Sequence, residues 1–140
     1  MLLKMPLAAL SVAVLLSPAA RGEPTPQNSG QNPVVRTVFS QPSNVPGKSM
    51  RAVTVHYPPG AKSAAHHHAK SAFIMAYVLS GAIRSQVEGE PARVYQAGET
   101  WSESPGAHHT VSENASSIDP ADLLAVFLVD TGDGPLTTDD

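Results

Sequence analysis

The sequence predicts an all-β fold in which short strands close into a barrel or a sandwich. Among 140 residues there are 13 prolines and 10 glycines, a composition typical of a protein with many tight turns. The apolar and β-branched runs between these turns are short, and none shows a convincing helical period. A small closed barrel leaves no exposed sheet edge and has an interior wide enough for one small ligand.

Each expected strand is bounded by turn residues. The strands are expected at 34–39, 51–57, 73–79, 82–87, 92–96, 100–103, 108–112 and 123–129. Residues 73–79 and 123–129 are apolar throughout, so we expect both to be buried strands, the latter on both faces. The Ser80-Gly81 pair predicts a tight turn that makes 73–79 and 82–87 a hairpin.

The N-terminus has the pattern of an export signal. Lys4 gives it a positive charge, residues 7–16 are almost wholly apolar, and small residues follow at 17–20. We therefore expect a signal peptide at 1–20, a disordered leader at 21–33, one barrel domain at 34–130 and a flexible acidic tail at 131–140. The alternative for the apolar run is an N-terminal membrane anchor, although the run is short for a bilayer. The expected product is exported, periplasmic or secreted, and has no membrane segment in its mature form.

Composition excludes several classes of function. The net charge is −3 and the basic residues are scattered, which argues against nucleic acid or an anionic membrane surface as a partner. Cysteine is absent, so the chain has neither disulfides nor thiolate chemistry.

Five of the six histidines follow two Pro-Gly corners. His66, His67 and His68 come after Pro58-Pro59-Gly60, and His108 and His109 come after Pro105-Gly106. Alternate residues of a strand share a face, so His66 and His68 point one way and His67 the other. With His109 as a third donor, they could bind one divalent transition metal, for which Fe, Mn, Ni, Cu and Zn are all candidates. His67 and His108 are expected to face outward or to support the ligands without binding the metal.

These motifs resemble those of the cupin superfamily, in particular its small single-domain members. Gly60, His66 and His68 match the opening of the first cupin motif, and residues 77–81 match its ending. Gly98, Gly106 and His109 match the second motif, in which Pro105 and Asn114 are each displaced by one place. The resemblance covers about 34–129. It implies a cupin-type β-barrel, also described as a double-stranded β-helix or jelly roll, with His66, His68 and His109 as metal ligands.

The chain departs from the cupin pattern at one ligand. The glutamate of the first motif is missing, and Ile74 stands where it would be, so a three-histidine site is one expectation. The fourth ligand could instead be the amide oxygen of Gln86 or the carboxylate of Glu103. The alternatives are that Gln86 is a polar group lining the barrel and that Glu103 is a solvated charge at a strand end. Glu103 and Tyr77 are also the candidates for a catalytic base.

Two classes of function remain open. The first is an exported metalloenzyme acting on a small oxygenated organic molecule, by a dioxygenase-like oxidation, an isomerisation or a lyase reaction. The second is a non-catalytic cupin module that binds a small molecule or a metal. The resemblance also makes a homodimer plausible.

Overall fold

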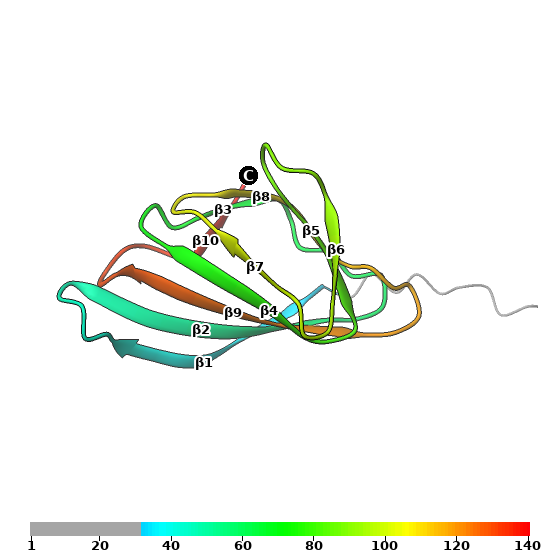
Figure 1. Ribbon diagram of the computed structural model, residues 1–140, viewed down its shortest axis with the longest axis horizontal. Helices are drawn as coiled ribbons and strands as arrows, with labels where there is room; N and C mark the ends of the chain where they lie inside the picture. The colour runs from blue at the N-terminus through cyan, green and yellow to red at the C-terminus, as the bar shows by residue number, and fades with distance from the viewer. Residues whose placement is uncertain (1–31) are drawn as a thin grey trace, which may run out of the picture.

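The computed structural model describes residues 32–140, which form two five-stranded antiparallel sheets facing each other (Figure 1). The predicted all-β barrel is therefore confirmed. The expected signal peptide and most of the expected leader lie outside the described residues. Within 32–140 there is no helix of the length and apolarity that crossing a bilayer requires.

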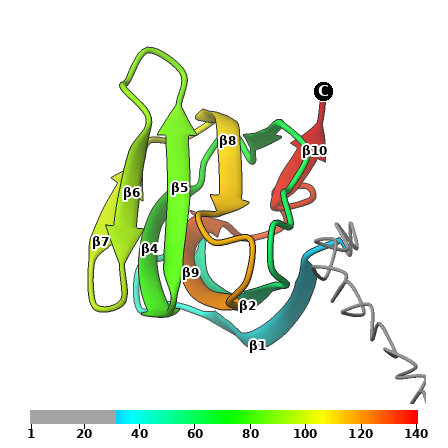
Figure 2. The same cartoon turned by 90° about the vertical axis from the view of Figure 1, so that its right-hand side faces the viewer.

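Strand order places the two histidine segments side by side. The first sheet has the order β1 (Val34–Pro42), β2 (Lys48–Tyr57), β9 (Ala121–Asp130), β4 (Phe73–Ser80) and β7 (Thr100–Glu103). The second has the order β10 (Thr137–Asp139), β3 (His66–His68), β8 (His108–Asn114), β5 (Ala82–Val87) and β6 (Arg93–Gln96). The short strand β3 lies between β8 and β10. Figure 2 labels β8 and β10, and β3 connects the two in the same sheet.

The core lies between the inner faces of the two sheets. In β2, Val53, Val55 and Tyr57 alternate inward, and Ile74 and Phe127 contribute further buried side chains from β4 and β9. Complete burial of one such aliphatic or aromatic side chain stabilises the fold by about 1.5–3 kcal/mol. This apolar packing holds the sheets together around the buried histidines.

Strands β4 and β5 are not the hairpin that the sequence suggested. β4 pairs with β7 and β9, whereas β5 pairs with β6 and β8 in the other sheet. Gly81 turns the chain from one sheet to the other with a φ of 68°, a region that L side chains rarely adopt. A Cβ atom there would lie 2.5 Å from the carbonyl oxygen of Pro120, so only glycine fits this corner.

The apolar strands are less buried than expected. In β4, every second side chain is exposed, including Phe73 at 50% and Leu79 at 46%. β9 alternates between buried and half-buried residues, although it was expected to be buried on both faces. No further layer of described residues covers the outer face of this sheet, so its side chains stay partly exposed. An apolar run in the sequence does not show whether such a layer is present.

The expected flexible tail contains strand β10, which is paired with β3. Thr137 lies opposite His68, and Asp139 lies opposite His66. The backbone amide of Ala69 also donates to the carbonyl of Leu136 over 3.1 Å. This segment therefore lies directly beside the first histidine cluster.

Candidate metal centre

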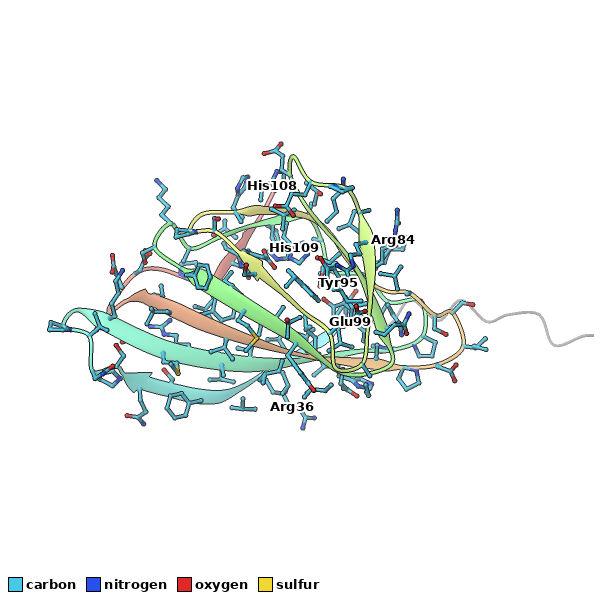
Figure 3. All side chains as sticks on the ribbon, in the orientation of Figure 1. Arg36, Arg84, Tyr95, Glu99, His108 and His109 are labelled. Atoms are coloured by element: carbon cyan, nitrogen blue, oxygen red, sulfur yellow. The ribbon has the colours of Figure 1, made fainter. Side chains whose placement is uncertain are left out.

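Strand pairing brings three histidines to one point inside the barrel. His66 lies opposite His109 across β3 and β8, and His68 is two residues farther along β3. All three side chains are buried, with 8%, 7% and 4% of the surface of His66, His68 and His109 exposed. Figure 3 shows His109 directed into the barrel and its neighbour His108 on the outside. We call His66, His68 and His109 the inner triad.

The inner triad has the spacing of a metal site. Its ring centroids are 4.9 Å apart for His66 and His68, 5.2 Å for His66 and His109, and 5.8 Å for His68 and His109. One ring nitrogen of each residue can be chosen so that all three lie within 4.8 Å of one another. Three imidazoles in this arrangement can bind one transition-metal ion and leave further coordination positions open.

Each imidazole is held by a neighbouring group through one of its nitrogens. Nδ1 of His66 lies 2.8 Å from the carbonyl oxygen of Ala64, and Nδ1 of His68 lies 3.4 Å from that of Leu136. The hydroxyl of Ser85 lies 2.8 Å from Nε2 of His109. Such partners fix the orientation of a metal-binding histidine and leave its other nitrogen free for the ion.

Glu103 provides a carboxylate beside the inner triad from a neighbouring strand. It lies directly opposite Ile74 in the pairing of β4 with β7, and Ile74 occupies the place of the missing motif glutamate. Opposed residues of an antiparallel pair share a face and have Cβ atoms only about 5 Å apart. Glu103 is 3% exposed, and Nε1–H of Trp101 donates to its Oε1 over 3.0 Å. The carboxylate is thus present, one strand away from its usual position.

Two buried polar atoms of this cluster have no hydrogen-bond partner among residues 32–140. Nε2 of His68 and Oε2 of Glu103 are 2.9 Å apart, but their geometry is not that of a hydrogen bond. Oε1 of Glu103 also lies 3.4 Å from Nδ1 of His109. Burying polar atoms without a partner costs free energy, and a cation bound between them would satisfy both. The three imidazoles of the inner triad therefore fit a divalent metal, and Glu103 lies beside two of them, where it could contribute a carboxylate ligand.

The protonation states favour metal binding. Burial lowers the pKa of His109 to about 4 and also lowers the pKa of His66, so both rings are neutral at neutral pH. Burial by itself would raise the pKa of Glu103, but its interactions with His68 and His109 lower it overall. Neutral imidazoles and an ionised carboxylate are the forms that bind a metal.

In the metal-free protein, the free energy of unfolding is expected to fall by up to about 3 kcal/mol between pH 7 and pH 4 because of His109. The unfolded imidazole takes up a proton near its ordinary pKa of 6.5, whereas the folded one does so only at about 4. The contribution of the neutral, buried His109 to the free energy of unfolding is therefore complete above about pH 6.5 and is lost as the pH falls toward 4. Urea unfolding at several pH values measures it. His109→Gln should flatten the pH dependence, and an unchanged slope in this variant would contradict the assignment.

A cavity of about 440 Å³ opens beside the metal-binding residues. His66, His109 and Glu103 form part of its wall. The remaining wall is mixed: apolar side chains of β2, β4 and β9 line part of it, and polar groups that include Lys62 and Asp139 line another part. A small molecule in this cavity could reach a metal bound to the inner triad while its other atoms contact an apolar surface.

The structure does not bring Gln86 or Tyr77 to the inner triad. Gln86 is half-buried, and its Nε2–H donates to the carbonyl of Glu90 over 3.0 Å, outside the cluster. Tyr77 is 37% exposed on the outer face of β4, because its buried neighbours Ala76 and Val78 take the inward positions. Gln86 as a ligand and Tyr77 as a base are thus not supported, whereas Glu103 lies at the site.

Sequence reasoning missed several residues of the site. The hydroxyl of Tyr57 lies 3.0 Å from that of Ser63 and 2.7 Å from that of Ser112, and all three residues line the cavity. Burial raises the pKa of Tyr57, so its phenol stays protonated and can donate a hydrogen bond. The alternation of Val53, Val55 and Tyr57 in one strand was a signal for its inward position. Leu136 had no such signal, since its segment was expected to be a flexible tail.

The family comparison agrees with this architecture. A family model described as a cupin domain matches residues 53–127, which is more than half of the chain and includes the inner triad and Glu103. Among curated proteins, none matches the sequence.

Solved structures with the same fold include both uncharacterised proteins and enzymes. A Klebsiella pneumoniae protein with a double-stranded β-helix domain is 20% identical, with a TM-score of 0.62, over 80% of this chain and 89% of its own. The DMSP lyase DddQ from Ruegeria pomeroyi is 18% identical, with a TM-score of 0.63, over 86% of this chain and 58% of its own. A recombinant oxalate oxidase in complex with glycolate is 20% identical, with a TM-score of 0.59, over 82% of this chain and 58% of its own.

Proposed function

Because this chain belongs to the cupin family, as its match over residues 53–127 shows, we propose that it is a metal-dependent enzyme acting on a small oxygenated organic molecule. The observation that carries the proposal is the burial of the inner triad around one point beside a cavity, with the buried Glu103 next to His68 and His109. A purely structural core gains little from four buried polar side chains, two of which have atoms without a hydrogen-bond partner in the part of the chain that the structure describes.

The inner triad and Glu103 are the residues that would hold the metal. A divalent transition metal bound there would polarise the oxygen atoms of a substrate and increase its acidity. The carbonyls of Ala64 and Leu136 and the hydroxyl of Ser85 would keep the imidazoles oriented. Trp101 would orient Glu103 through its indole N–H.

The cavity wall favours a substrate with oxygen atoms at one end and an apolar remainder. The apolar side chains of β2, β4 and β9 form one part of the wall, against which an apolar part of a substrate could pack. The hydroxyls of Tyr57, Ser63 and Ser112 form a separate polar group that can bind one further oxygen or nitrogen atom of the substrate. Small carboxylates and hydroxy acids have this chemistry, and two enzymes of the same fold are an oxalate oxidase and a DMSP lyase.

Turnover by the metal-loaded protein tests the proposal. Tag-free protein is loaded separately with Fe²⁺, Mn²⁺, Ni²⁺, Cu²⁺ and Zn²⁺ and incubated with small carboxylates, hydroxy acids and phenols. We expect turnover of at least one substrate with at least one metal and none in a His66→Ala variant. Oxygen consumption during turnover would identify a dioxygenase-like reaction, and turnover without it an isomerase or a lyase.

Saturable ligand binding without turnover across this panel would instead support a non-catalytic binding module. If the His66→Ala variant kept both metal binding and turnover, this result would contradict the proposed site.

We also propose that the chain is exported, on the basis of the charged, apolar and small-residue pattern at residues 1–20. Cell fractionation tests this, and a cytoplasmic product retaining Met1 would contradict it.

A further inference from the structure

A second group of metal-ligating side chains lies on the outer face of the same strands. His67 and His108 are paired across β3 and β8, and their rings are stacked with centroids 4.2 Å apart and planes 16° apart. Asp140, just after β10, contributes a carboxylate to the same place. We call His67, His108 and Asp140 the outer cluster.

The outer cluster is separate from the inner triad. Strand alternation sends His67 to the face opposite His66 and His68, and 56% of its side chain is exposed to solvent. His108 is likewise on the opposite face of β8 from His109, as Figure 3 shows. An ion bound outside would therefore share no ligand with one bound inside.

The distances within the outer cluster suit a small divalent cation. Nε2 of His108 lies 3.0 Å from Oδ2 of Asp140, and Nε2 of His67 lies 3.8 Å from Oδ1 of the same residue. The three donor atoms lie within 4.8 Å of one another. Zn²⁺ binds imidazole nitrogen and carboxylate oxygen at about 2.0–2.2 Å, which places tetrahedral donors about 3.3 Å apart. Only small side-chain movements would bring all three atoms to these positions.

From this geometry we propose that the outer cluster is a second metal site, which binds Zn²⁺ or a cation of similar ligand preference. Two imidazoles and one carboxylate are a known donor set for zinc, and the exposed position leaves the fourth place to water. The stacked rings are already held side by side by the pairing of β3 with β8, so little conformational freedom is lost on binding.

A metal here would also fasten the C-terminal segment to the sheet. Asp140 belongs to the segment in which Leu136 contacts His68, and its own backbone amide donates to Ala65 over 3.2 Å. An ion shared by Asp140, His67 and His108 would connect this segment to β3 and β8. The outer site would therefore stabilise the segment that orients one ligand of the inner site.

Zinc titration of the full, tag-free chain tests the proposal. The titration is run at pH 8, because hydrogen bonding to Asp140 raises the pKa of His108. We expect His67→Ala to bind one Zn²⁺ fewer per chain than the unaltered protein, whatever the inner site binds. Asp140→Asn should weaken this ion at least about tenfold, since it loses the ligand charge.

His56→Ala is the matched control. His56 is also an exposed histidine paired with a carboxylate, Nδ1 lying 2.8 Å from Oδ1 of Asp122. Its removal should leave the number of bound ions unchanged. An equal number of ions in His67→Ala and the unaltered protein would overturn the second site, as would an equal loss in His56→Ala.

Hydrogen exchange tests the fastening of the C-terminal segment. Zn²⁺ should slow amide exchange in the peptide containing residues 136–140 of the unaltered protein, and His67→Ala should abolish this protection. Zinc binding without any slowing in this peptide would overturn the proposed role.

Discussion

Replacing His66 by alanine is expected to lower the metal affinity of the inner site by more than about 100-fold. Loss of a partner that only orients a ligand commonly lowers affinity 10- to 100-fold, and loss of the ligand itself should cost more. The variant also leaves Glu103 buried with one donor fewer around the ion. Metal retained after gel filtration in a chelating buffer, measured by mass spectrometry of the elements, gives the effect. His109→Ala should behave in the same way.

His67→Ala is the control for this prediction, because His67 is the sequence neighbour of both inner ligands on β3 but faces outward. It should keep the chelator-resistant ion of the inner site and lose only the ion of the outer cluster. An equal loss of the resistant ion in His66→Ala and His67→Ala would contradict the alternation on which the site depends. Circular dichroism of each variant establishes that it is folded.

Replacing Glu103 by glutamine is expected to weaken metal binding about 10- to 100-fold with little change in the volume of the side chain. The amide cannot supply the negative charge that balances a divalent ion among three neutral imidazoles. Isothermal titration with Mn²⁺ or Zn²⁺ measures the change. Glu99→Gln is the matched control, since Glu99 is an exposed carboxylate that pairs with Arg93 over 2.8 Å outside the cluster (Figure 3). It should leave the inner affinity unchanged.

Moving the carboxylate across the strand pair tests whether its position or merely its presence matters. Glu103→Ile should weaken binding, and adding Ile74→Glu should restore most of it, because the two positions are directly opposed. Ile74→Glu places the carboxylate where the cupin motif has its glutamate. Failure of Glu103→Ile to weaken binding would show that Glu103 is not a ligand. Failure of the second change to restore it would show that the two positions are not equivalent.

Local patterns predicted most of the strands and the inner triad. Alternation placed His66 and His68 together and His67 outside, and the second Pro-Gly corner identified His109. The separation of β4 from β5 was not predictable in this way, because Ser80-Gly81 is as suitable for a hairpin as for a corner between sheets. Glu103 lies opposite Ile74 because β4 pairs with β7. This pairing joins residues that are distant in sequence, so local patterns could not predict it.

The contribution of the C-terminal segment was hidden for a different reason. Residues 131–140 are polar and acidic, a composition that predicts a flexible tail. Their order comes from pairing with β3, which is itself only three residues long and consists of histidines. Neither segment has the apolar alternation by which strands are recognised, so their mutual stabilisation is visible only in the fold.

The position of a bound metal is the most direct test of the site. A crystal of the full, tag-free chain loaded with a transition metal and measured on both sides of its absorption edge locates the ion by anomalous scattering. We expect a peak inside the barrel, about 2.0–2.3 Å from one nitrogen of each residue of the inner triad and from an oxygen of Glu103. Absence of an ion at that point in a metal-saturated crystal would contradict the account, as would an ion that Glu103 does not touch.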